Sequence, residues 1–445
     1  MNQPFNSQKV GLTTAFSIVV ANMVGTGIFT SLGFQIVDIK SIFALLMLWI
    51  VGGMVAMSGA LSYGELASKL PRSGGEYHFL SKIYHPVLGF LAGWVSFLVA
   101  FSAPTALAAM AMASYSNAFF GYGNEILFAL AIVLILSLIH SFQIRFGGGF
   151  QRVVTFLKIA LILFFIVSGF FVADHQPMEI IPHSAGWEEV FSGAFAVSLI
   201  FVSYAFSGWN ASVYITDEIR DPVKNIPKSL ILGTMVVIIL YFLLNYIFLY
   251  TTPLEEMEGK IEIGFLSATH IFGDYGGRLM ALLITLLLIS TVSAMIWIGP
   301  RVTMVMGEDY KLLGFLSRKN KYNVPVVAIW VQTTLTVILI VSSTFEKVLV
   351  YAGFIMNLFT LLAVIGLFVL RIKHPELPSR YKVTGYPITP LIFILLSLWT
   401  LTYLMMDRPV ESILGLITVL AGLFIYYANK VYSKKNQEIY HEKAE

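Results

Sequence analysis

The sequence contains no cysteine and few charged residues. The absence of cysteine excludes disulfides, thiolate metal sites and catalytic thiols. Asp, Glu, Lys and Arg together make up 12% of the chain, whereas soluble domains contain about 25%. Hydrophobic residues account for 57%, and the mean hydropathy is +0.80. This composition excludes a soluble globular protein and predicts an integral membrane protein with several spans.

Motifs of the common hydrolytic and metal-dependent enzymes are missing as well. The chain has no GxSxG, no HExxH and no paired His and carboxylate cluster within its apolar segments. The net charge of +3 says little about partners, and we expect no nucleic-acid partner. We therefore expect a protein that is not an enzyme and that has no cofactor and no metal site.

Twelve apolar segments follow one another along the chain, and a membrane-spanning helix needs about 20 such residues. We therefore predict an all-α membrane protein with twelve transmembrane helices. The segments are 11–36, 41–69, 84–118, 125–142, 151–173, 190–215, 228–251, 277–306, 325–342, 345–371, 388–406 and 410–431. Pro104 predicts a kink in the third segment. The loops 174–189 and 252–276 are acidic and are expected to be solvated.

The basic residues predict the orientation. With the N-terminus inside, 22 of the 28 Lys and Arg residues lie in cytoplasmic segments and one, Lys158, lies within a span. The five outside are Lys40, Lys260, Arg278, Lys347 and Arg408. Because cytoplasmic loops of membrane proteins are enriched in Lys and Arg, residues 1–10 and the tail 432–445 are predicted to be cytoplasmic, in a plasma or inner membrane.

Two glycines interrupt the first segment at its middle. Gly25 and Gly27 stand in Asn22-Met23-Val24-Gly25-Thr26-Gly27-Ile28-Phe29, and glycine costs ~1 kcal/mol relative to alanine inside a helix. One interpretation is that the backbone opens there, which is tolerated at membrane depth only beside protein or a water-filled cavity. The alternative is that the glycines only allow close helix packing.

The sixth segment has a second interruption at Ser207-Gly208-Trp209-Asn210. Five spans separate the first segment from the sixth, so the second set of five enters the membrane from the opposite side. Paired interruptions in matching spans of an inverted repeat indicate a transporter binding site. We therefore predict a first repeat over 11–173, a second over 190–371, broken helices one and six, and two further helices over 388–431.

Several motifs together resemble the amino acid–polyamine–organocation permease superfamily, and within it most closely the L-type and bacterial neutral amino acid permeases. The motifs are Gly25–Phe29; Ser62–Ala67 with Pro71–Tyr77; Ser207–Asn210 with Asp217–Pro222 and Asn225–Lys228; Gly299–Arg301; and Leu370–Arg371 with His374–Leu377. The resemblance implies a secondary-active permease that moves an amino acid by alternating access. The alternative is an amino-acid sensor built on a permease fold.

The resemblance and the physics of an opened helix together imply how an amino acid binds. A helix N-terminus attracts a carboxylate, and unpaired carbonyls suit an ammonium group. The carboxylate site is expected at Gly25, Thr26 and Gly27, and the ammonium site at the carbonyls of Met23, Tyr204, Ala205 and Ser207. Gly208 would permit the break, and the candidate pocket or gate residues are Phe206, Trp209 and Trp297. Valine at Gly25 or Gly27 is expected to abolish binding.

Acidic residues are absent from the first, third, sixth, eighth and tenth spans at membrane depth, which favours a neutral substrate because a charged side chain would need a partner. Glu65, Asp217 and Glu218 are expected to pair with Lys69, Arg72 or Arg220. Lipid surrounds the chain, and protons are a candidate coupling ion.

Lys158 is the one basic residue placed inside a span. It either snorkels to the interface or points into the bundle. In sodium-coupled relatives of the fold a sodium ion ties the first and eighth helices, and in many similar permeases a lysine at this place replaces it. The resemblance therefore implies that Lys158 braces the first helix near Gly25 against Ser290 or Thr291, that transport is sodium-independent, and that Lys158 is able to titrate during the cycle.

Overall fold

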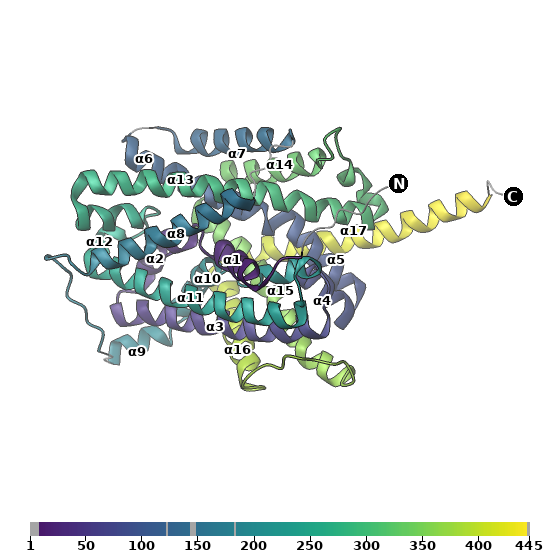
Figure 1. Cartoon of the computed structure of the whole chain (residues 1–445), viewed down its shortest axis with the longest axis horizontal. Helices are drawn as coiled ribbons and strands as arrows, with labels where there is room; N and C mark the ends of the chain where they lie inside the picture. The colour runs from purple at the N-terminus through teal and green to yellow at the C-terminus, as the bar shows by residue number, and fades with distance from the viewer. Residues whose placement is uncertain (1–8, 122, 143–147, 182–183, 443–445) are drawn as a thin grey trace. The chain divides into compact units, whose positions relative to one another are not determined.

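The computed structural model describes residues 9–121, 123–142, 148–181 and 184–442, with the backbone alone for 148–152 and 434–442. The secondary structure of the described part is helical, with loops and turns between the helices and no strand; its one isolated bridge pairs Val10 with Ile219. Figure 1 shows the helices in chain order. The all-α prediction is therefore confirmed.

Most helices overlap the predicted segments, although α13 begins 14 residues before its segment and α17 ends 11 residues after its own. In chain order the elements are α1 Leu12–Met23, α2 Gly27–Asp38, α3 Ile42–Lys69, α4 Gly75–Ile83, α5 Pro86–Val95, η1 Ser96–Ala100, α6 Ser102–Phe120, α7 Glu125–Ser141, α8 Gly148–Gly169, α9 Ser184–Val190, α10 Gly193–Ala205, η2 Ala211–Glu218, α11 Pro222–Thr251, α12 Leu254–Met257, α13 Ile263–Asp309, η3 Lys311–Ser317, α14 Val326–Ser342, α15 Phe345–Lys373, α16 Ile388–Asp407 and α17 Pro409–Glu442.

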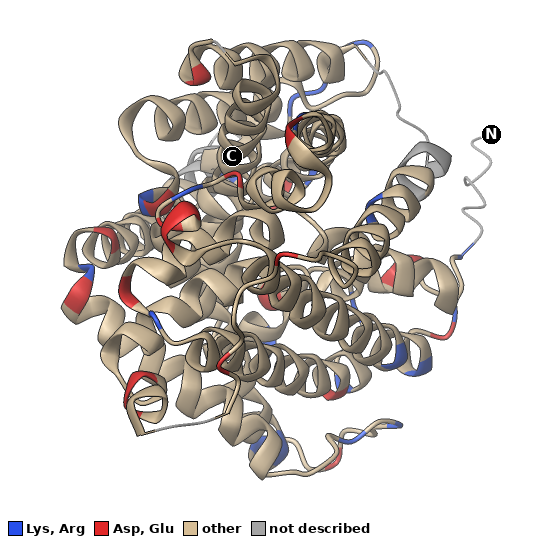
Figure 2. Cartoon of the chain, turned by 90° about the vertical axis from the view of Figure 1, so that its left-hand side faces the viewer, with Lys and Arg blue, Asp and Glu red and all other residues tan. Residues whose placement is uncertain are grey.

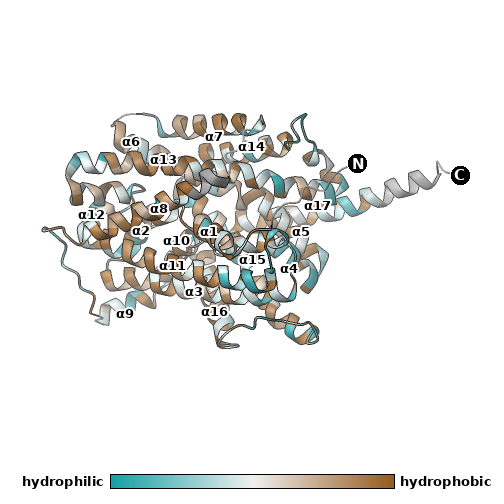
Figure 3. Ribbon diagram, in the orientation of Figure 1, coloured by the Kyte–Doolittle hydropathy of each residue, from teal (hydrophilic) through white to brown (hydrophobic). Residues whose placement is uncertain are grey.

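Eight helices of the described chain are long and apolar enough to cross a bilayer, or nine when the bent pair α9 and α10 counts as one span. Shorter apolar helices occupy the predicted fourth, fifth and ninth spans. The helix bodies are hydrophobic in Figure 3, whereas Figure 2 shows most charged residues at helix ends and in loops. The chain is thus a multi-pass membrane protein; the count of twelve and the inverted repeat stay predictions.

The chain divides into two compact units, which are described separately. The first contains residues 1–85, 155–259 and 357–403, and the second contains 86–154, 260–356 and 404–445. This division differs in kind from the predicted division into two sequential repeats, because each unit takes segments from both halves of the chain.

In the first unit the two half-helices α1 and α2 pack against α11 and α10 respectively, and α3 packs against both α10 and α11. Its core includes three aromatic rings in contact with one another. They belong to Trp49 of α3, to Phe206, which follows α10, and to Tyr241 of α11, and their centroids are 5.1–6.1 Å apart. Aromatic contacts of this kind add packing energy beyond area burial. They fix the position of the residue that follows α10.

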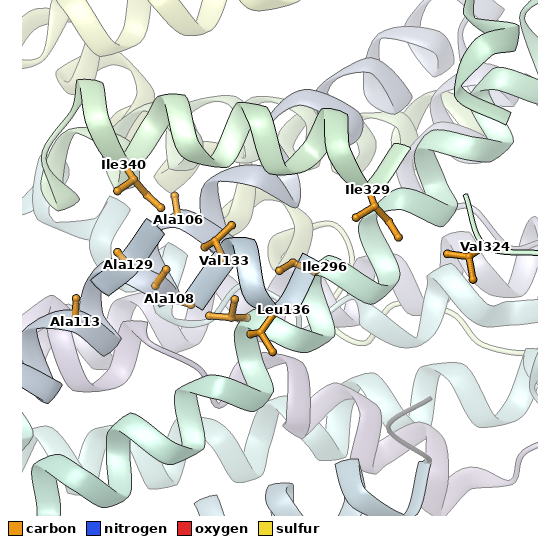
Figure 4. Close-up of a cluster of buried hydrophobic side chains, with 12 residues drawn as sticks. Ala106, Ala108, Ala113, Ala129, Val133, Leu136, Ile296, Val324, Ile329 and Ile340 are labelled. Carbon is orange, nitrogen blue, oxygen red and sulfur yellow. The ribbon is translucent and has the colours of Figure 1, made fainter. Parts of the chain in front are cut away.

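In the second unit α6 packs against α7, α13 and α14. Figure 4 shows the apolar cluster between them, in which α6 supplies alanines such as Ala106 and Ala108 and the other helices supply branched residues such as Val133 and Ile296. Small side chains let helix backbones approach closely where the hydrophobic effect cannot drive packing. The alanines of α6 therefore explain why four helices share one apolar cluster.

A π-helical turn lies just before Pro104, in the segment where a kink was predicted. The third apolar segment changes from α5 into the π-helical turn η1 and resumes as α6 at Ser102. Proline has no N–H to donate to the carbonyl four residues earlier, which is that of Ala100, and its ring crowds that carbonyl. The π turn ends at this residue.

The second acidic segment, which was predicted to be a loop, is largely helical. Residues 252–276 contain α12 and the first part of α13, whose helix is interrupted at Gly273 with a φ of 74°. The acidic residues of both loops also make defined contacts. Glu258 pairs with Lys40 at 2.8 Å, Glu262 accepts from Ser114 at 2.8 Å, and Glu189 accepts from the N–H of Ser41 at 2.9 Å.

Glu65 forms an ion pair, as expected, but with a different partner from those predicted. Its carboxylate accepts two hydrogen bonds from Arg371, at 2.8 and 2.5 Å, and a third from the N–H of Val383 at 2.8 Å. The Arg371 guanidinium also stacks on Tyr386, 3.7 Å from the ring centre. Because Glu65 is 1% exposed, this bidentate pair is buried on one side and joins α3, α15 and the segment after α15.

We expect Glu65→Ala to destabilise the protein by about 3–5 kcal/mol, because it leaves the Arg371 guanidinium unpaired in a largely buried site. Melting of the purified protein in detergent measures this. Glu308→Ala is the control, since Glu308 pairs with Lys319 at 3.3 Å in an exposed position, where a pair is worth about 0–1 kcal/mol. Equal melting temperatures for the two variants would contradict the importance of the buried pair.

Candidate functional site

The first helix is interrupted at the predicted place. α1 ends at Met23 and α2 begins at Gly27. The N–H of Val24 still bonds to the carbonyl of Val20 at 2.9 Å, and the N–H of Gly25 closes a tight turn onto the carbonyl of Met23 at 2.8 Å. The first N–H groups of α2 have no acceptor within their own helix, so this end carries partial positive charge.

The sixth helix is interrupted in the same way. α10 ends at Ala205, a turn follows, and the chain continues as the 3-10 helix η2. Gly208 has a φ of +100°, a conformation that residues with a Cβ rarely adopt. The prediction that Gly208 permits this break is supported by its backbone.

The two breaks contact each other within the first unit. A Cβ on Gly208 would lie 2.8 Å from the backbone of Asn22, and a Cβ on Gly27 would lie 2.5 Å from the Cα of Ala205. The hydroxyls of Thr26 and Tyr204 are 3.3 Å apart. The sequence therefore brings together residues that are about 180 positions apart, and it does so through backbone-to-backbone approach that only glycine allows.

The two glycines of the first break have different roles. Gly27 is required for contact with Ala205, whereas a Cβ on Gly25 would meet only the carbonyl oxygen of Met23, at 3.9 Å. Both interpretations of the glycine pair thus apply, one to each residue. Close packing explains Gly27, and Gly25 is the position that borders open space.

The carbonyls of the breaks are used unequally. The Met23 carbonyl already accepts from Tyr241 Oη at 2.6 Å and from the N–H of Gly25, so the idea that it is unpaired is wrong for this conformation. The Tyr204 carbonyl accepts from the N–H of Ser207 at 2.9 Å. Among the described residues the carbonyls of Ala205 and Ser207 accept no hydrogen bond, which leaves them as the better ammonium partners.

Lys158 of α8 points into the first unit. Its side chain is 5% exposed, and Nζ donates to the carbonyl of Val24 in the first break at 3.2 Å. It therefore does not snorkel to the surface, and its contact with the opened first helix agrees with the prediction. Ser290 and Thr291 lie on α13 in the second unit, so the bracing of Lys158 against them stays a prediction.

The candidate gate aromatics differ in their surroundings. Phe206 is 1% exposed and packs against Trp49 and Tyr241. Trp209 is 7% exposed, and its ring centre lies 4.8 Å from that of Tyr63. Both are core residues of the first unit in this conformation. Trp297 belongs to α13 in the second unit, is 43% exposed, and has the Arg301 guanidinium 4.1 Å above its ring.

Sequence reasoning missed Tyr241, which binds the end of α1 through Met23. A lone tyrosine in an apolar span gives no periodic signal that separates it from ordinary packing residues. Among the described residues no group of three His, Asp or Glu side chains lies close enough to hold a metal ion.

We expect Gly27→Ala to lower the melting temperature of the purified protein in detergent by several degrees, because a methyl group at 2.5 Å from the Ala205 backbone forces α2 and α10 apart. Gly25→Ala is the matched control, since its methyl group has room. If both variants melt with the wild type, the two breaks do not depend on this contact.

Comparison with known proteins supports one family. The amino acid permease family model matches residues 10–428. The serine/threonine exchanger SteT of Bacillus subtilis is 25% identical, covering 95% of this chain and 97% of the relative. The human large neutral amino acids transporter small subunit 2 is 26% identical, covering 96% and 81%. The mouse b(0,+)-type amino acid transporter 1 is 26% identical, covering 94% and 87%.

The family and these relatives are transporters, which agrees with the expectation that the chain is not an enzyme. The match runs through both broken helices and nearly the whole length of the chain. The chain belongs to the amino acid permease family.

Proposed function

We propose that this permease moves a neutral L-amino acid across the plasma or inner membrane by alternating access and without sodium. The observation that carries the proposal is the pair of opened backbones, in contact through Gly27 and Gly208, with Lys158 bound to the first of them. Helix ends and free carbonyls complement the two charges that every α-amino acid has.

The substrate carboxylate lies against the start of α2, near Gly25, Thr26 and Gly27. Gly25 borders open space, and the N–H groups of the first turn of α2 lack partners within the helix. The substrate ammonium lies against the carbonyls of Ala205 and Ser207, which accept no hydrogen bond among the described residues. Phe206, Trp209 and Trp297 contribute to the pocket or its gates when they move.

A neutral substrate side chain is favoured by the side chains of the breaks. Residues 23–28 and 204–209 contain no Asp or Glu that could pair with a cationic substrate. The names of two relatives agree with this, since they describe exchange of serine and threonine and transport of large neutral amino acids. Exchange of one amino acid for another is therefore one form of transport to test, and proton coupling is the other.

Lys158 supplies the positive charge that would otherwise come from a bound cation. Its ammonium is within hydrogen-bond distance of the Val24 carbonyl, just after the end of α1, where that carbonyl accepts no helical hydrogen bond among the described residues. A covalently attached cation at this place makes a sodium ion unnecessary. We expect Ser290 and Thr291 of α13 to complete the site, so that Lys158 joins the first, fifth and eighth spans.

The direct test is uptake of a panel of labelled L-amino acids into liposomes that contain the purified protein. Each amino acid is tested with and without internal amino acid, sodium and a pH gradient. We expect uptake of one or more neutral amino acids that is unchanged when sodium is replaced by choline. Binding without uptake would favour the alternative, a sensor built on a permease fold. A requirement for sodium would contradict the role proposed for Lys158.

We expect Lys158→Ala to reduce the transport rate at least tenfold while the protein stays folded, because the Val24 carbonyl and the first break lose their positive partner. The measurement is uptake by equal amounts of monodisperse protein. Lys40→Ala is the matched control, since Lys40 pairs with Glu258 in an exposed position and should transport like the wild type. Normal uptake by Lys158→Ala would refute the assignment.

A further inference from the structure

A second buried carboxylate of the first unit contacts the segment that leaves the sixth-helix break. Glu76, in the first turn of α4, is 7% exposed. Its Oε1 accepts from Tyr63 Oη and from Asn210 Nδ2, each at 2.8 Å, and its Oε2 accepts from Tyr214 Oη at 2.5 Å. Asn210 ends the break and Tyr214 belongs to η2, so one carboxylate joins α3, α4 and the exit of the sixth helix.

The Glu76 carboxylate is held by neutral donors. Among the described residues it has no ion-pair partner. Burial lowers the pKa of His78 to about 4, and the charges of Arg72 and Lys82 lower it as well, so His78 is neutral at pH 7. Glu76 has no counter-ion that could replace its hydrogen-bond donors. Moving the buried carboxylate away from these donors is therefore costly in free energy.

The loop before α4 holds the same segment at a second point. The N–H of Asp217 donates to Ser73 Oγ at 2.9 Å, and the N–H of Ser73 donates to Asp217 Oδ2 at 3.2 Å. Gly75 has a φ of +54°, and a Cβ there would lie 2.5 Å from the ring of Tyr214. The tyrosine ring therefore packs directly on the loop backbone, which leaves no space for another residue at Gly75.

We propose that Glu76 is a positioning residue for transport: with Ser73 it clamps residues 210–217 to α4 throughout the transport cycle. The inference rests on the proposed function of the two breaks. η2 is a short 3-10 helix, which is weak by itself, and Gly208 before it has no side chain that restricts backbone rotation. The contacts of Glu76 and Ser73 hold residues 210–217, which follow Gly208, in one position. They thereby limit the directions in which the carbonyls of Ala205 and Ser207 can point.

A disulfide tests whether the clamp stays closed. The chain has no cysteine, so the two thiols of Ser73→Cys with Asp217→Cys would be the only ones present. The reciprocal hydrogen bonds place these residues within reach of each other. We expect the oxidised double variant to transport within twofold of its reduced form. Transport that stops on oxidation and returns on reduction would show that the contact opens, and would overturn the proposal.

Glu76→Gln tests whether the clamp positions the site, because an amide replaces one acceptor oxygen with a donor that faces other donors. We expect the substrate concentration for half-maximal uptake to rise on the order of tenfold, the loss of one hydrogen bond to a charged group, with the maximal rate within twofold. Tyr214→Phe should also raise the substrate concentration for half-maximal uptake, but by a smaller factor. Tyr84→Phe is the control, since that hydroxyl donates to the carbonyl of Leu362 instead.

The rate of amide hydrogen exchange in residues 209–218 tests the clamp without any transport measurement. We expect faster exchange in Glu76→Gln and in Tyr214→Phe but not in Tyr84→Phe, even if no amino acid proves to be a substrate. Unchanged exchange in the first two would overturn the clamp while leaving the proposed function intact. If Glu76→Gln does not fold, Tyr214→Phe carries the test.

The last experiment combines Glu76→Gln with Ser73→Cys and Asp217→Cys in one variant. We expect oxidation to bring the half-saturation concentration back to within threefold of the parent, because a covalent link at Ser73 and Asp217 replaces the lost contact. A disulfide that forms but restores nothing would show that Glu76 acts by another route, and the proposal would be wrong.

Discussion

The contact between the two interrupted helices is the constraint on which the rest of the first unit depends. Each interruption exposes backbone groups that a membrane cannot satisfy, at a cost of several kcal/mol for each group left unpaired. The two breaks lie against each other, Gly27 against Ala205 and Gly208 against Asn22, so each faces protein and not lipid there. What remains unpaired, at Ala205 and Ser207, is then available to a ligand that has charges of its own.

Polar side chains from the surrounding helices complete this arrangement. Tyr241 and Lys158 donate to the carbonyls of Met23, the last residue of α1, and of Val24, the residue that follows it. Neither partner is free to exchange with bulk water, since both are buried. The end of α1 is thus held by specific donors, while the start of α2 is held by close packing. This asymmetry explains why the donors cluster before Gly25 and the open space lies beside it.

The sequence predicts much of this and fails at identifiable points. Composition and the two glycine interruptions are local signals, so the fold class, the two breaks and the depth of Lys158 follow from them. Pairings over long separations leave no local signal, which is why the partner of Glu65, 306 residues away at Arg371, was predicted incorrectly. The different roles of Gly25 and Gly27 depend on where a missing Cβ would point, and only the packed structure decides that.

Three buried charges of the first unit show how a membrane protein with few charges uses them. Glu65 is neutralised by Arg371, Lys158 is bound by a backbone carbonyl, and Glu76 is held by neutral hydroxyl and amide donors. Each of them contacts a segment that is not a regular α-helix: the loop at Val383, the first break at Val24 and the exit at Asn210. Burying a charge costs too much desolvation free energy for buried charges to be a general means of stabilising helix packing. It is retained where irregular backbone has polar groups to share, and in this unit that is where the backbone must hold a shape that helix hydrogen bonds cannot provide.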